Sequence, residues 1–219
     1  YKIPTIIALV AGVFNEAWQI SAISESKDRE EVSKFFSAVF ERYCAVLFLG
    51  CAFLIPFTPL GASLLLDESY YEAWGFMPVL LVATVFSSLV TFVGTIYTVK
   101  KKTAMSFITA ALGALLNIIL NLALIPKMGA QGAGIATAAS YFAVFAVRAI
   151  HSKKFMPFNL GAWRLSLNTV IVLIQVIFMI CNLPYNGIVQ IFMIGLIVLL
   201  NGKSLISAFA KILKKFIKN

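Results

Sequence analysis

Several polar side chains lie inside long apolar stretches of the sequence, where an unpaired polar group costs free energy. Such groups often line a cavity or the path of a polar or charged ligand. An amide can hydrogen-bond a polar ligand, a carboxylate can exchange a proton or hold a cation, and a guanidinium can hold an anion. The candidate residues are Asn15, Glu16, Gln19, Arg42, Asn117, Asn121 and Arg148.

Glu16 is the only acidic residue well inside an apolar stretch, and it lies about 20 Å along a helix that would begin near Ile3. A coupling-ion or gating carboxylate would suit that depth, and so would a glutamate with a structural partner. Arg42 and Arg148 lie at the ends of apolar stretches. Anion binding and anchoring at the membrane surface explain these two arginines about equally well.

The sequence offers little for metal or cofactor chemistry. Its three cysteines lie in apolar runs, and its one histidine, His151, stands in a basic segment. We therefore expect no disulfide and no metal site. The glycines from Gly129 to Gly134 do not fit a dinucleotide fingerprint, and no phosphate-binding loop is present, so we expect no cofactor. These glycines suit a tight turn followed by close helix contact.

An enzyme is the alternative from a different class of function. A membrane glycosyltransferase or acyltransferase would need catalytic carboxylates, for which Asp67, Glu68 and Glu72 are the candidates. Their segment is short, and His151 lies on the opposite side of the expected membrane. We therefore expect that the protein is not an enzyme.

The composition identifies the class of protein. Of the 219 residues, 61% are hydrophobic and only 12% are charged, with a mean hydropathy of +0.94. A soluble domain with so little charge would expose large apolar surfaces, and a disordered chain would be far more polar. The sequence is therefore that of an integral membrane protein.

Seven stretches are long and apolar enough to cross a bilayer as helices, which takes roughly 20 residues each. We expect an all-α polytopic membrane bundle. Pro56 and Pro59 should close its second helix, Pro126 should stop the fourth, and residues 184–187 should form a tight turn. The expected spans are residues 3–23, 37–57, 74–99, 103–125, 132–150, 163–183 and 187–200.

Lysine and arginine are unevenly distributed among the links between these spans. Alternate links and the C-terminal tail hold sixteen of the eighteen basic residues, and the other links together with Lys2 hold two. This asymmetry follows the positive-inside rule, and it explains the net charge of +9 without a nucleic-acid partner. It places the C-terminus in the cytoplasm and the first residue outside.

Small and hydroxyl-bearing residues form stripes along the expected helices, where they either allow close packing or line a polar interior. One stripe consists of Thr84, Ser87, Ser88, Thr91, Gly94, Thr95 and Thr98. Gln175 is the only polar residue from 170 to 181 and Gln190 is the only one from 188 to 200, so we expect these last two spans to be peripheral. Residues 203–219 form an amphipathic tail that suits the surface of the cytoplasmic leaflet.

The segment 117–137, NIILNLALIPKMGAQGAGIAT, resembles the hallmark of bacterial polysaccharide flippases. Glu16-Ala17-Trp18 is similar to the same family, and so is the loop that contains Pro59-Leu60 and Glu72-Ala73. These proteins are the Wzx-like repeat-unit translocases of the multidrug/oligosaccharidyl-lipid/polysaccharide superfamily, which have a MATE-like fold.

The resemblance implies two pseudo-symmetric six-helix lobes, followed in many members by two peripheral helices. Residues 1–162 would then belong to the C-terminal lobe and residues 163–202 to the peripheral pair. The N-terminal lobe of the same polypeptide would be a missing partner.

The function implied is the flipping of an undecaprenyl-diphosphate-linked oligosaccharide across the bacterial cytoplasmic membrane, for surface polysaccharide biosynthesis. An ion gradient or product removal would supply the energy. The alternative within the superfamily is an exporter of drugs or organic cations, whose cavity should be acidic and aromatic.

Overall fold

The computed structural model describes residues 4, 5, 7–9, 11, 12 and 29–217, with side chains up to residue 207. Almost all of these residues are helical and none of them lies in a β-strand, which confirms the all-α class. Within this part of the chain, five helices are long and apolar enough to cross a membrane, as a multi-pass membrane protein requires. The expected number of seven spans stays a prediction.

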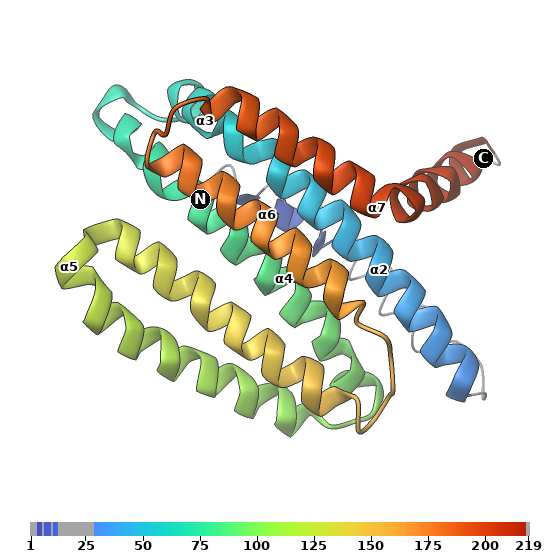
Figure 1. The fold of residues 1–219 in the computed structure, drawn as a ribbon. Coiled ribbons are helices and arrows are strands. Elements are labelled where there is room, and N and C mark those ends of the chain that lie inside the picture. The colour runs from blue at the N-terminus through green and yellow to red at the C-terminus, as the bar shows by residue number, and fades with distance from the viewer. Residues whose placement is uncertain (1–3, 6, 10, 13–28, 218–219) are drawn as a thin grey trace.

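The chain runs back and forth along the bundle (Figure 1). Helix α2 (Arg29–Leu54) begins with Glu30 and Glu31, whose charges suit a helix N-terminus. Three short helices then lead to the central helix and to two helical hairpins. The elements after α2 are η1 (Ile55–Phe57), α3 (Thr58–Leu65), η2 (Glu68–Phe76), α4 (Met77–Val99), α5 (Thr103–Ser152), α6 (Ala162–Ile180) and α7 (Asn186–Ile217).

The region after α2 is helical where the sequence suggested a loop. Pro56 and Pro59 each occupy one of the first two positions of the next helix, η1 and α3. A proline is tolerated there because its missing N–H would have no partner inside the helix. The prolines therefore end α2 at Leu54, as expected, but they also start the short helices that cap this end of the bundle.

The chain reverses inside α5 at Gly129 and not at Pro126, where we expected the helix to stop. Pro126 lies inside the helix, which continues past it. Gly129 has φ 56° and ψ −137°, a conformation that is costly for any residue with a Cβ. A Cβ at Gly132 would lie 2.6 Å from the carbonyl oxygen of Leu124, so the two arms are in close contact beside the turn. The expected tight turn with close helix contact is confirmed.

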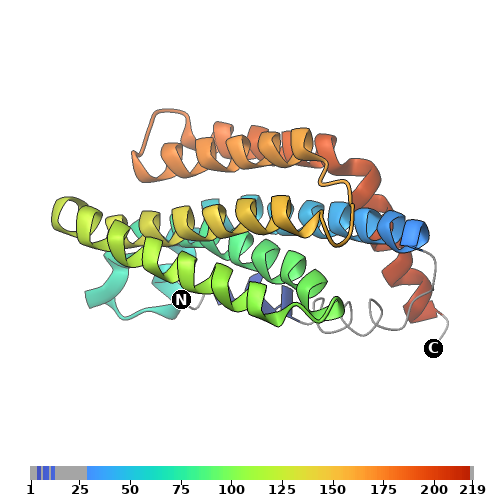
Figure 2. The same ribbon diagram turned by 90° about the horizontal axis from the view of Figure 1, so that it is seen from below.

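The helices pack in layers around α4 (Figures 1 and 2). Helix α4 is buried along most of its length and contacts α5, α2 and α6. Helices α6 and α7 lie side by side and pack on α2, so that they form a separate layer in Figure 2. Helix α5 contains the least buried window of the five membrane-length helices, and Thr109 and Gly113 are the only buried residues in its first arm.

Aromatic rings join α2 to α4 in the core. The ring centres of Phe36 and Phe40 lie 4.9 and 5.5 Å from that of Phe92. Phe158, in the link between α5 and α6, packs edge-on against both α2 rings. Pairs of this kind are worth about 0.5–1.5 kcal/mol each beyond the area they bury. They hold α2 and α4 in place beside the second arm of α5.

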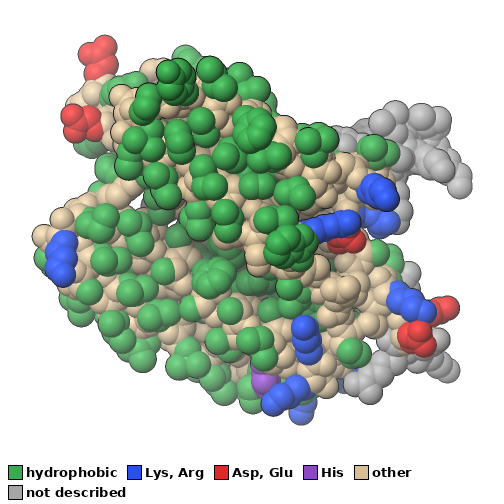
Figure 3. Space-filling view, in the orientation of Figure 1, with side chains coloured by type: hydrophobic (Ala, Val, Ile, Leu, Met, Phe, Trp, Pro, Cys, Tyr) green, Lys and Arg blue, Asp and Glu red, His purple; other side chains and the backbone are tan. Residues whose placement is uncertain are grey.

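Charged residues separate toward the two ends of the bundle (Figure 3). We call one end the basic end, because it carries Lys100, Lys101, Lys102, Lys153 and Lys154. The opposite end carries the exposed Asp67, Glu68 and Glu72, together with Lys127 near the turn of α5. This separation agrees with helices that cross a membrane, and the basic end is the one that we predict to be cytoplasmic.

Candidate functional site

Arg148 lies in the second arm of α5 and is buried, with 6% of its surface exposed. Its Nε donates to Thr109 Oγ1 at 2.9 Å, and its Nη1 donates to the Val90 carbonyl oxygen at 2.9 Å. Its Nη2 donates to the carbonyl oxygen of Ser106 at 3.0 Å and lies 3.4 Å from the Ser106 hydroxyl. Arg148 therefore ties together both arms of α5 and the middle of α4.

Among the described residues, every acceptor that Arg148 contacts is neutral. The ion pairs in the described part of the chain are Lys34 with Glu30 and Arg164 with Glu41, and neither involves Arg148. A guanidinium has five N–H groups, and the four contacts of Arg148 leave at least one of them for another acceptor. A buried cation without a carboxylate is costly, and an anion is the partner that would compensate it.

Gly94 makes the room that the guanidinium occupies. A Cβ at this position would lie 2.5 Å from Nη1 of Arg148. Gly113, in the first arm, likewise leaves room for the side chain of Val144. Gly94 belongs to the stripe of small residues that suggested close packing from sequence, and the structure shows that it admits the end of Arg148.

A pocket of about 380 Å³ lies between α4 and the two arms of α5, and we call it the Arg148 pocket. Its polar residues come from both arms of the hairpin, and small residues provide much of the remaining wall. The Ser140 hydroxyl on this wall is buried and has no hydrogen-bond partner in the part of the chain that the structure describes. The pocket is lined by Val90, Ala110, Gly113, Ala114, Asn117, Thr137, Ser140, Tyr141, Val144 and Arg148.

Asn117 and Asn121 act together in the first arm. The Asn121 Nδ2 donates to the Asn117 carbonyl and to Asn117 Oδ1, both at 2.9 Å. Both residues are half-buried, and Asn117 lines the Arg148 pocket whereas Asn121 does not. The structure thus brings Asn117 and Arg148 into one site. Asn121 lies outside the pocket lining and hydrogen-bonds to Asn117.

The hydroxyl stripe of α4 is largely satisfied within the helix. Thr84, Ser88 and Thr91 each donate to the carbonyl four residues earlier. Thr95 donates to the carbonyl of Phe92, three residues earlier. A hydroxyl that bonds to its own helix needs no ligand, so the stripe is explained by packing.

Arg42 does not reach the Arg148 pocket. It is half-buried on α2, and its Nε donates to Ser207 Oγ on α7 at 2.9 Å. The neighbouring Glu41 accepts from Ser204 Oγ at 2.8 Å and forms an ion pair with Arg164. This cluster links α2, α6 and α7 near the basic end, and the sequence did not indicate it. The other candidates, Asn15, Glu16 and Gln19, lie outside the described residues.

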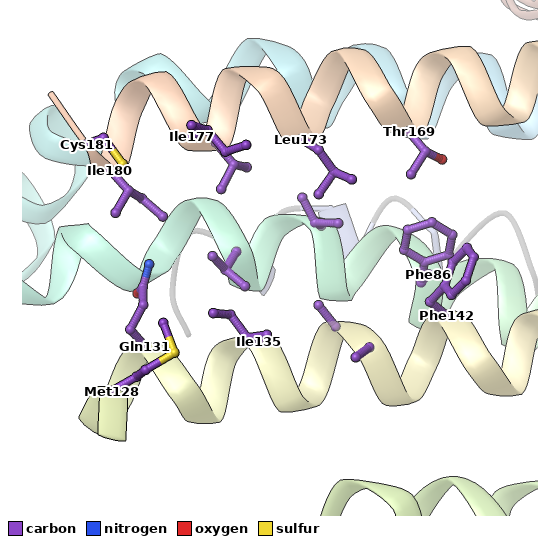
Figure 4. A pocket seen from close by; sticks show the side chains of 15 residues that line it. Phe86, Met128, Gln131, Ile135, Phe142, Thr169, Leu173, Ile177, Ile180 and Cys181 are labelled. Atoms are coloured by element: carbon purple, nitrogen blue, oxygen red, sulfur yellow. The ribbon is translucent and has the colours of Figure 1, made fainter. Parts of the chain in front are cut away.

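A second pocket is an apolar groove of about 610 Å³ (Figure 4). It lies between α6 and the second arm of α5, with α4 as its floor. Leu173 and Ile177 point into it from α6, and Ile135 points into it from α5 (Figure 4). Phe86 and Phe142 close one end, while Met128, Gln131 and Cys181 lie at the other. The groove suits a hydrocarbon chain, since apolar side chains form almost all of its wall.

His151 has a partner that sequence reasoning missed. Its Nδ1 lies 3.0 Å from the hydroxyl of the buried Tyr97, a contact that its place in a basic segment did not suggest. Tyr97 and His151 each lie near the end of a long apolar span, α4 and α5 respectively. This shared position is the signal in the sequence that could have suggested their contact. The pair joins the ends of α4 and α5 close to Arg148.

Two pairs of buried amides join α6 to α7. The side chains of Asn168 and Asn201 donate to each other's Oδ1, at 3.2 and 2.8 Å. Gln175 Nε2 donates to Gln190 Oε1 at 3.0 Å, and Gln190 Nε2 donates to the Gln175 carbonyl at 3.0 Å. From the sequence, both glutamines stood out as polar residues in otherwise apolar spans. The structure shows that each of them is buried.

The described residues include no group of three His, Cys, Asp or Glu side chains that could hold a metal ion. Compared as a whole, the chain matches no protein-family model, no curated protein and no solved structure.

Proposed function

We propose that the protein translocates an undecaprenyl-diphosphate-linked oligosaccharide from the cytoplasmic to the outer leaflet of the bacterial cytoplasmic membrane. In this proposal the polar, anionic part of the cargo passes through the polar interior of the bundle, and its lipid tail stays in apolar surroundings. The protein acts as a Wzx-like flippase and catalyses no covalent step.

The observation that carries the proposal is the environment of Arg148. Arg148 is a cation buried between apolar helices beside a polar pocket, and the described residues that hold it are all neutral. Such a site suits a ligand that brings its own negative charge. The apolar groove beside α6 adds support, because a lipid-linked cargo needs a hydrocarbon path next to its polar path. The amides and hydroxyls around Asn117 and Ser140 suit sugar hydroxyl groups.

The exporter of organic cations is the alternative within the same superfamily. A cationic drug would meet a guanidinium in the Arg148 pocket, and none of the described residues that line it is a carboxylate. Like charges in a desolvated site repel, so this pocket disfavours such a cargo.

A preceding lobe of the same polypeptide is part of the proposal. Ala110 and Ala114 line the Arg148 pocket yet stay exposed on the first arm of α5. A second helical lobe against this arm would close the pocket toward the membrane.

The proposed orientation has the basic end in the cytoplasm. Single cysteines at Lys101 and Glu68 would test it in intact cells, after replacement of the native cysteines. An impermeant reagent should label position 68 and spare position 101. Labelling of position 101 alone would reverse the orientation.

The function is tested by complementation of a strain that lacks its own flippase, using the full-length protein. Arg148→Gln should reduce surface polysaccharide at least tenfold at equal protein level, because the cargo's charge loses its partner. Arg148→Lys should retain part of the activity. Arg164→Gln is the matched control, since that arginine is exposed and paired with Glu41. Wild-type polysaccharide with Arg148→Gln would contradict the proposal.

A further inference from the structure

We propose that the Arg148 pocket is a subsite for one acidic sugar residue, with its oxyanion on Arg148 and its hydroxyl groups on Ser140 and Asn117. The inference deepens the proposed function and rests on it for the origin of the sugar. It concerns binding, so it can be tested apart from transport.

Ser140 is the first observation. It is 5% exposed, and its Oγ has no acceptor or donor in the described part of the chain. Thr109 and Thr137 in the same hairpin donate to carbonyls of their own arms, as hydroxyls in apolar helices commonly do. A buried hydroxyl without a partner is costly, and this one lines a pocket where a ligand can supply the missing bond.

Asn117 is the second observation, and it lies on the facing arm. Its Oδ1 already accepts from Asn121, whereas its Nδ2 makes no bond to another described residue. An amide nitrogen can donate two hydrogen bonds. The Asn117 Nδ2 is therefore available to a hydroxyl oxygen in the pocket.

The spacing of these groups fits a sugar that carries an anion better than a bare anion. Ser140 precedes Arg148 by eight residues, which corresponds to about 12 Å along the helix. The arginine side chain leans toward the N-terminus of its helix and shortens that separation. One end of the pocket thus offers a cation and the other end offers neutral hydrogen-bonding groups. A single phosphate would use only the first.

The volume agrees with an occupant of this kind. Pockets for small molecules span about 300–1,000 Å³, and the Arg148 pocket holds about 380 Å³. Gly94 and Gly113 keep it open, since larger residues would displace Arg148 or Val144. The oxyanion has two sources in a lipid-linked cargo, namely the diphosphate on the first sugar or the carboxylate of a uronic acid.

The experiment uses the full chain in nanodiscs of zwitterionic lipid, titrated by calorimetry with four probes. Glucose 1-phosphate and glucuronate carry both features, glucose lacks the charge, and inorganic phosphate lacks the sugar. We expect at least one acidic sugar to bind at least tenfold more tightly than glucose and phosphate. The acidic sugar that binds more tightly identifies the source of the oxyanion.

Two variants assign the contacts. Ser140→Ala should weaken binding of the acidic sugar about threefold to tenfold, because one hydrogen bond is lost. It should leave the thermal midpoint unchanged or higher, because an unpaired buried hydroxyl is removed. Arg148→Gln should weaken binding of the acidic sugar about tenfold or more. If the glutamine variant does not fold, binding is measured with Arg148→Lys instead. Ser88→Ala is the matched control, since Ser88 is buried, bonds to its own helix and does not line the pocket.

The results separate the subsite from the transport function. Unchanged binding by folded Ser140→Ala would overturn the subsite, and so would an affinity for glucose equal to that for both glucuronate and glucose 1-phosphate. Weaker binding by Ser140→Ala in a protein that fails to complement the flippase-deficient strain would support the subsite and remove only the proposed function. Normal complementation together with no binding of either acidic sugar would leave transport standing without this subsite.

Discussion

The two hairpins of the molecule treat their buried polar residues in opposite ways. In the hairpin of α6 and α7, Asn168 meets Asn201 and Gln175 meets Gln190, so amide groups pair across the helices, and of these four residues only Gln175 Oε1 is buried without a partner. In the hairpin of α5, Arg148 has only neutral partners among the described residues, and Ser140 has none. The first hairpin is largely closed by its own hydrogen bonds, whereas the second leaves a charge and a hydroxyl beside a pocket.

This difference shows how a polar residue in an apolar helix can be interpreted. A polar group that pairs across the interface is satisfied by folding, and its role is structural. A polar group that stays unpaired keeps a cost that a ligand can remove. Polarity in a span is therefore a weak signal of function until its partners are known.

The largest effect on stability should come from breaking a closed amide pair. Gln190→Leu leaves the buried Gln175 amide without its side-chain partner, which should cost about 1–3 kcal/mol. The double variant Gln175→Leu with Gln190→Leu should recover much of this loss, because no unpaired amide remains. Unfolding in mixed micelles measures both. A double variant that loses the sum of the two single losses would show that the pair is not coupled.

The next effect should appear in transport and not in stability. Gly94→Ala places a Cβ against Nη1 of Arg148, and the flexible end of the arginine can move away. We expect the unfolding free energy to change by less than about 1 kcal/mol, because the helix gains an alanine. Surface polysaccharide should fall several-fold as the guanidinium shifts. Gly50→Ala is the control, since a Cβ there meets nothing within 4 Å. Equal activity of the two variants would mean that the arginine's exact position is unimportant.

A smaller effect is expected at the end of the α5 hairpin. Tyr97→Phe removes the hydroxyl that contacts His151 Nδ1 and keeps the ring in the core. The loss should be about 0.5–1.5 kcal/mol, the usual net value of one hydrogen bond. If the contact stabilises the fold, the double variant Tyr97→Phe with His151→Ala should lose little more unfolding free energy than Tyr97→Phe alone. Losses of unfolding free energy that simply add would argue against a stabilising contact.

The smallest effect concerns the exposed Asp67 at the end opposite the basic end. The backbone N–H of Ser69 and its hydroxyl both donate to the Asp67 carboxylate and hold its pKa below the ordinary value of 3.8. Because the folded pKa lies below the unfolded one, this stabilisation is fully present above pH 3.8 and is lost as pH falls through the folded pKa. A carboxyl titration followed by NMR should show the Asp67 pKa rising toward 3.8 in Ser69→Ala. An unchanged midpoint would exclude the Ser69 hydroxyl as a cause and leave the backbone N–H of residue 69, which the variant keeps.

Much of the fold could be predicted because its signals are local. Apolar runs predicted membrane-length helices, and Gly129 with Gly132 predicted the turn of α5, which the backbone angles at Gly129 confirm. The segment after Leu54 was harder to predict. A proline ends one helix and can begin another, and sequence spacing alone does not choose between these two outcomes.

The candidate site was only partly predictable. Arg148 and Asn117 were both candidates from the sequence, and the structure places them in one pocket. Ser140 was not a candidate, because a serine in an apolar helix commonly bonds to the carbonyl four residues earlier. Gln175 and Gln190 were noted but not paired, because they are fifteen residues apart on two different helices.

The sequence by itself determined that the chain is helical, apolar enough for a membrane and basic at one end, since composition and period are properties of single segments. Only the tertiary structure decided which polar groups find partners. A hydrogen bond between helices depends on the depth, rotation and distance of both partners, and no single segment carries that information. Arg148 reaches Val90, Ser106 and Thr109 because three helical segments meet where Gly94 leaves room for its guanidinium.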